Sequence, residues 1–141
     1  MAERTLTSTS NDAILVRKAQ STITATRTLT EADAGKEYNI ATDALVVTLP
    51  AITADNIGME FTFRNTGADG NNIITLSPAS SDGINGTIAN AAADSVASGV
   101  VNKDLINTKA TANNGDFVKI RAVALTKWFI MEGVGIWASQ A

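Results

Sequence analysis

The residues best suited to hold a metal ion lie in the stretch NTGADGNNIITLSPASSDGING (65–86). A regular calcium loop places carboxylate or amide oxygens at alternate positions, with Gly at the sixth position and a bidentate Glu at the twelfth. Counted from Asp69, neither of those two positions carries the required residue. A less regular metal site made of Asp69, Asn71 and Asp82 is still compatible with the sequence, although Gly, Asn and Asp also favour turns. We therefore expect turns here and predict no metal and no cofactor.

Acid–base and nucleophilic chemistry also find few candidate residues. The chain has no Cys and no His, which removes thiolate nucleophiles, most zinc sites and the commonest general base. Asp and Glu total 14, but they are separated along the chain and fall in turns or on outward strand positions. The GVG at 133–135 lacks the rest of a dinucleotide fingerprint and predicts a kink. We predict that the protein is not an enzyme; a small hydrolase would need a cleft with two carboxylates.

Aromatic side chains can serve as platforms that bind sugars or bases. Trp128 and Trp137 both sit in the apolar run near the C-terminus, and aromatic residues are only 5% of the chain. Packing is therefore the favoured role for these side chains. The set predicted for the core or an oligomer seam is Phe61, Phe63, Trp128, Phe129, Ile130 and Trp137.

The composition limits the partners that the chain can have. Its 141 residues suit one domain, and the net charge of -3 with scattered cations argues against nucleic acid. No apolar run approaches the roughly 18 residues of a membrane span, and the N-terminus has no apolar signal-peptide core, so we expect no membrane contact. Hydrophobic residues are 45% and charged residues 18%. Low charge indicates either a weakly charged surface or a surface covered by partners.

Short β-branched segments separated by turn residues predict an all-β protein. We expect a polar N-terminal arm (1–12) followed by one domain (13–141), a β-sandwich or barrel of short antiparallel strands. Residues 58–65 and 72–77 are expected to pair as a β-hairpin, and the Ala-rich 90–101 is either a short helix ending at Gly99 or a loop. The remaining strands are expected at 13–17, 21–29, 38–41, 44–50, 83–89, 115–123 and 127–137.

Several of these segments resemble small structural proteins of tailed bacteriophages. The resemblance lies in residues 29–78, in DGINGT (82–87), in NTKATANNGDFVKI (107–120) and in KWFIMEGVGIWA (127–138), and it covers about residues 29 to 138. The nearest kind is the head decoration, or capsid cement, protein; related modules occur in tail fibres. The link AVALTK (122–127) departs from the family pattern because it has no Gly, and a longer, more apolar tip is expected there.

The resemblance implies a virion protein that binds the outer surface of the expanded capsid and cements it. Its partners would be the major capsid protein and two further copies of itself in a homotrimer, and assembly would take place in the host cytoplasm. We expect Arg4, Leu6, Ile14 and Val16 of the N-terminal region to contact the capsid. The alternative is a tail or fibre module that binds a host-surface glycan, which would require Trp128 or Trp137 to be exposed beside polar side chains.

Overall fold

The computed structural model describes residues 17–141, which form a β-sandwich with one short 3-10 helix, Glu31–Asp33. The all-β sandwich is therefore confirmed. The strands are β1 (Gln20–Ile23), β2 (Arg27–Thr28), β3 (Glu37–Ile40), β4 (Leu45–Thr48), β5 (Glu60–Asn65), β6 (Ile74–Ser77), β7 (Gly83–Ile88), β8 (Ser95–Ser98), β9 (Leu105–Asn107), β10 (Phe117–Ala124), β11 (Lys127–Val134) and β12 (Trp137–Ser139).

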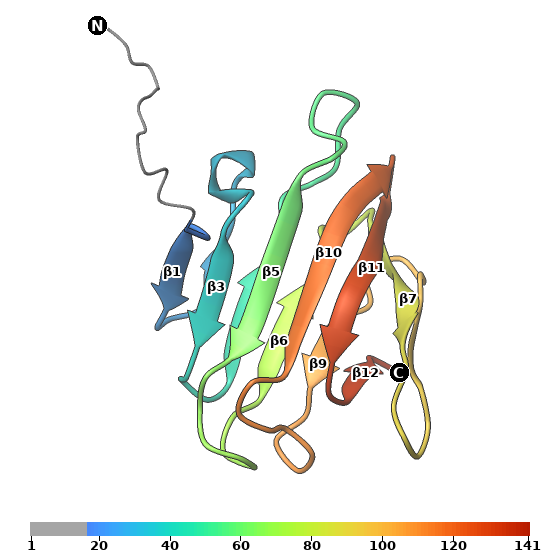
Figure 1. Cartoon of the computed structure of the whole chain (residues 1–141). Helices are drawn as coiled ribbons and strands as arrows, with labels where there is room; N and C mark the ends of the chain where they lie inside the picture. The colour runs from blue at the N-terminus through green and yellow to red at the C-terminus, as the bar shows by residue number, and fades with distance from the viewer. Residues whose placement is uncertain (1–16) are drawn as a thin grey trace, which may run out of the picture.

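Two mixed sheets face each other across the core (Figure 1). The seven-stranded sheet has the order β1-β3-β5-β10-β11-β7-β8, and the five-stranded sheet has the order β12-β9-β6-β4-β2. The expected antiparallel pairing is wrong for half of the strand pairs, since five of the ten are parallel. The cause is the path of the chain: from β1 to β6 each strand lies in the other sheet from the one before it, so alternate strands run side by side in the same direction.

This winding overturns two local predictions. The segment 21–29 is not one strand, because β1 belongs to the larger sheet and β2 to the smaller one. Residues 58–65 and 72–77 are not a hairpin, because the loop between β5 and β6 carries the chain from one sheet to the other. Turn-forming residues shape both a hairpin and an arch between sheets, so their presence alone does not decide the partner of a strand.

The C-terminal half follows the predictions more closely. Strands β10 and β11 form the expected antiparallel hairpin, and Gly135 has a φ of 97°, which provides the predicted kink before β12. The Ala-rich segment is neither a helix nor only a loop, because its residues 95–98 form β8. The expected longer tip is also wrong: only Leu125 and Thr126 separate β10 from β11, and Thr126 has a positive φ of 63°.

The core is filled by the side chains at alternate positions of the strands. In β5, Phe61 and Phe63 are fully buried, as predicted from the alternation in 58–65, and their rings lie 6.1 Å apart between centroids. Tyr38 of β3 stacks on Phe63 at 5.9 Å, and Trp128 of β11 meets Phe61 at 5.9 Å. This row of aromatic rings lies under the larger sheet, and each ring contributes apolar area that is removed from water on folding.

Candidate contact surfaces

One end of the sandwich is closed by a buried polar network. At this end β5 finishes at Asn65 and β9 at Asn107, and the Asn65 side-chain amide donates to the Asn107 Oδ1 at 2.9 Å, joining the two sheets. Asn107 Nδ2 donates to Asp116 Oδ2 at 3.0 Å and to the Ile136 carbonyl at 3.1 Å. Asn65 Oδ1 accepts from Asn72 Nδ2 at 3.3 Å. We call these four side chains (Asn65, Asn72, Asn107 and Asp116) the polar plug; each is at most 3% exposed.

The two aspartates that were considered as metal ligands lie at opposite ends of β6. Asp69 precedes β6, and its Oδ1 accepts the backbone N–H of Asn114 at 2.7 Å. Asp82 follows β6, and its Oδ2 accepts the backbone N–H of Ile52 at 3.0 Å. A single ion shared by Asp69, Asn71 and Asp82 is therefore excluded. Both aspartates instead hold neighbouring loops, and within residues 17–141 no three acidic side chains come together as a metal site would need.

The opposite end of the sandwich exposes apolar side chains. Nine large apolar residues are exposed among residues 17–141, and five of them lie in the loops or strand ends here: Ile57, Val100, Val101, Val123 and Leu125. We call this set the apolar end. Backbone hydrogen bonds tie its segments together, from Gly58 N–H to the Ala122 carbonyl at 2.8 Å and from Gly83 N–H to the Thr126 carbonyl at 2.9 Å. The loops that carry these side chains therefore lie at the end of the sandwich where β5, β7 and β11 begin and β10 ends (Figure 1).

Strand β1 begins at this same end. Gln20 pairs with Glu37, and Glu37 pairs with Thr62, so the parallel strands β1, β3 and β5 all start beside the apolar end. The sequence predicted an apolar tip at AVALTK (122–127), and Val123 and Leu125 are exposed there. It did not predict the apolar surface at SGVVN (98–102) or at Ile57.

The outer face of the larger sheet carries ion pairs. Arg121 Nη2 lies 2.8 Å from Glu60 Oε2, and Arg64 Nε lies 2.9 Å from Glu37 Oε2. Lys119 reaches Glu60 and Glu132 at 3.9 and 3.7 Å. Exposed pairs of this kind contribute little to stability, roughly 0 to 1 kcal/mol each. They make this face well hydrated and unsuited to a dry contact.

The outer face of the smaller sheet is uncharged. Two cross-strand rows cover it, one of hydroxyl side chains (Thr28, Thr48, Ser77) and one of mainly aliphatic side chains (Val46, Thr75, Ile106, Ala138). These side chains are small, and most are half-buried by their neighbours. Five strands about 4.8 Å apart and at most four residues long give a face of no more than about 300 Å². That is well below the roughly 800 Å² per partner of a standard stable interface.

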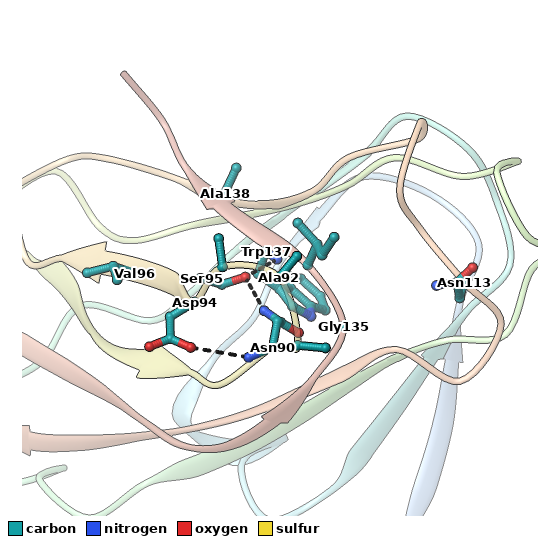
Figure 2. A pocket seen from close by; sticks show the side chains of 12 residues that line it. Asn90, Ala92, Asp94, Ser95, Val96, Asn113, Gly135, Trp137 and Ala138 are labelled. Atoms are coloured by element: carbon teal, nitrogen blue, oxygen red, sulfur yellow. Dashed lines mark hydrogen bonds between the residues drawn. The ribbon is translucent and has the colours of Figure 1, made fainter.

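A pocket of about 580 Å³ lies where the edge strands β8 and β12 meet without forming a ladder. It is lined by the 90–96 loop and by residues 135–138, with Asn113 at one side (Figure 2). The backbone N–H of Trp137 donates to Ser95 Oγ at 3.0 Å, which joins the two edges below the pocket. Asn90 Nδ2 donates to the same Ser95 hydroxyl at 2.9 Å. The pocket is thus mainly apolar, and Asp94 is its one charged lining residue.

The side chains predicted for the core or an oligomer seam fall into two groups. Phe61, Phe63, Trp128 and Trp137 are in the core, each at most 1% exposed. Ile130 is half-buried against the core, whereas Phe129 is half-buried and pairs with Arg121, whose side chain lies on the outer face of the larger sheet. The four residues predicted to contact the capsid, Arg4, Leu6, Ile14 and Val16, lie outside the described residues, as do the arm (1–12) and most of the strand expected at 13–17.

Neither tryptophan offers a face to a ligand. Trp128 is fully buried, and the Trp137 indole N–H donates to the Val134 carbonyl at 3.2 Å from a side chain that is 1% exposed. The exposed tryptophan that the glycan-binding alternative required is therefore contradicted at both positions.

A small hydrolase would need a cleft with two carboxylates. The carboxylates that share one surface, Glu37, Glu60 and Glu132, are each paired with a cation.

Comparison with known proteins adds no relative: no family model matches the chain, and no curated protein is significantly similar to it. Among residues 17–141 we find no helix with the length and apolar character needed to cross a membrane.

Proposed function

We propose that the protein is a structural component of a tailed-phage virion, which binds the outer surface of the expanded capsid and stabilises the head. The observation that carries the proposal is the apolar end. Exposed apolar side chains gathered on one side of a small domain are typical of a surface that a partner covers. The resemblance in residues 29–138 gives the class of partner, which is the major capsid protein.

The point where the N-terminal residues meet β1 also supports a contact between the apolar end and the capsid. Sixteen residues precede Arg17, and fully extended they span up to about 55 Å. They join β1 at the apolar end, so the arm and the apolar loops would reach the same partner. A polar arm that orders on a large surface adds contact area but loses conformational entropy, and the apolar loops supply the favourable term that offsets this loss.

The remaining surfaces fit a stabilising role more than a catalytic one. Ion pairs hydrate the larger sheet's outer face, and the two sheets are fixed to each other by the polar plug. A rigid domain whose apolar end binds the capsid would transmit mechanical load between the capsid subunits that it contacts. We assign the capsid contact to the apolar end and the arm, and the homotrimer to a separate contact described below.

The direct test mixes the purified protein with expanded shells and with unexpanded shells of the same virus and measures co-sedimentation. We expect binding to the expanded shell, and weaker binding when residues 1–12 are deleted. Binding to neither shell would refute the proposed function. Unchanged binding after the deletion would remove the arm from the contact and leave the apolar end alone.

A further inference from the structure

We propose that the pocket between β8 and β12 receives residues 13–17 of a second copy of this chain. This inference rests on the proposed homotrimer and names its contact. It assigns Ile14 and Val16 to that contact in place of the capsid contact expected from the sequence, and leaves Arg4 and Leu6 of the arm for the capsid. The pocket lies beside β8, whereas β1, the first strand after the segment, is the opposite edge of the seven-stranded sheet. Repeated around a closed ring, such a head-to-tail contact gives each copy one donor and one acceptor.

The chemistry of the segment fits the chemistry of the pocket. Residues 13–16 read AILV, the one apolar run in the chain before β1, and Arg17 follows them directly. The pocket presents the Ala side chains of the 90–96 loop together with Ile136 and Ala138. An extended segment would bring Ile14 and Val16 to the same side, two residues apart, where both could enter the pocket.

Charge supports the same pairing. Asp94 is exposed at the rim, and Figure 2 shows one of its carboxylate oxygens directed at the Asn90 backbone N–H, which donates to it at 3.3 Å, while the other points away. Arg17 is exposed and stands next to the apolar run. With Ile14 and Val16 in the pocket, Arg17 would lie at its rim, where a cation is favoured by the carboxylate.

Distance decides that the segment comes from another copy. Strand β1 and strand β8 are the two edges of the seven-stranded sheet, so six inter-strand steps of about 4.8 Å, roughly 29 Å in all, separate them. The pocket also lies at the end of β7 and β11 opposite to the start of β1. Six residues connect Ile14 to Gln20 and reach at most about 20 Å. The segment therefore cannot reach the pocket of its own chain.

The test uses two full-length variants and measures mass in solution without any shell. Ile14→Asp with Val16→Asp inactivates the segment, and Ala92→Trp fills the pocket. Ala54→Trp is the matched control, because Ala54 is also exposed but lies at the apolar end. We expect the wild type and the control to form the same closed oligomer, and each of the two variants alone to be monomeric. Mixed together, they retain one intact segment and one intact pocket and should form a pair of one chain each.

Three results would overturn the inference: a monomeric wild type at the highest concentration tested, a wild-type mass for either variant, or no pair in the mixture. If circular dichroism shows that Ala92→Trp is unfolded, charge reversal decides instead. Asp94→Arg should weaken association at least tenfold, and Arg17→Glu in the same chain should restore it; no weakening, or no restoration, counts against the contact. Shell binding is measured separately, so failure of the oligomer contact and failure of the capsid proposal are distinguishable.

Discussion

The two ends of the sandwich differ in the polar side chains that they bury and in the large apolar side chains that they expose. At one end, four polar side chains are buried and bonded to one another in the polar plug. At the other end, five large apolar side chains face outward. A buried polar network is stable only when its members are satisfied, and an exposed apolar cluster lowers its free energy only when it is covered. The comparison separates the end whose buried side chains join the two sheets, beside which the pocket lies, from the end that we propose contacts the capsid.

The largest effect should come from the polar plug. Asn107→Ala removes the acceptor of the Asn65 amide and the donor to Asp116 and to the Ile136 carbonyl. Because the groups left behind stay buried without partners, we expect a loss of about 3 kcal/mol in the free energy of unfolding. Urea denaturation measures it, with Asn113→Ala as the control, since the Asn113 side chain is exposed and its backbone N–H, which donates to Asp116, is kept in the variant. Equal small losses for both variants would mean that the plug does not hold the sheets together.

Substitutions at the apolar end should change stability little and shell binding strongly. Val100→Ser with Val101→Ser changes side chains that are 53% and 51% exposed, so we expect a loss of stability within about 0.5 kcal/mol per site. Binding to expanded shells should fall at least tenfold, because two apolar contacts are lost. The matched control is Val134→Ser, which is also 53% exposed but lies at the end of β11 near the plug. A similar fall in binding for the control would remove the distinction between the two ends.

A smaller effect tests whether the apolar end is rigid as well as exposed. The Tyr38 hydroxyl donates to the Asp33 carbonyl at 2.7 Å, which ties the short helix beside this end to β3. Tyr38→Phe should cost about 1 kcal/mol at neutral pH. Burial raises the pKa of Tyr38, so its contribution is complete below the unfolded value near 10 and is lost as pH rises through the folded value. Stability curves at pH 8 to 11 should therefore fall more steeply for the wild type than for Tyr38→Phe.

The smallest effect concerns Asp33 itself. The backbone N–H of Thr30 donates to Asp33 Oδ2 at 2.8 Å, and this bond, above the others, lowers the pKa of Asp33. The lowered pKa means that the contribution is present above the unfolded value near 4 and disappears as pH falls through the folded value. We expect Asp33→Asn to cost about 0.5 kcal/mol at pH 7 and nearly nothing at pH 2, by thermal unfolding. An equal cost at both pH values would show that the charge is not the cause.

Sequence patterns predicted the faces of the strands better than their partners. The alternation in residues 58–65 placed Phe61 and Phe63 inward, as the structure confirms. The same alternation continues to Asn65, and Asn107 lies two residues after Leu105, so both amides fall on the inward face of their strands. We placed Asn65 in the strand 58–65 but assigned Asn107 to no strand, so the contact between the two amides was not predicted.

The parallel pairing and the two surfaces could not be predicted from the sequence for physical reasons. Period two fixes which side of a strand is buried, but it does not say whether the next loop returns to the same sheet or crosses to the other. The apolar end combines residues from loops that are far apart in the chain, Ile57, Val100 and Leu125, and only the fold brings them together. The pocket likewise exists only because β8 and β12 become neighbouring edges.

The most direct test of the central claim is amide hydrogen exchange of the protein, free and bound to expanded shells. The account predicts new protection in residues 51–58, 99–102 and 124–127, which carry the apolar end or adjoin it. It predicts no change in residues 65–72 and 113–116, the segments around the plug. Protection gained on the uncharged outer face of the smaller sheet, with the apolar end unchanged, would contradict it.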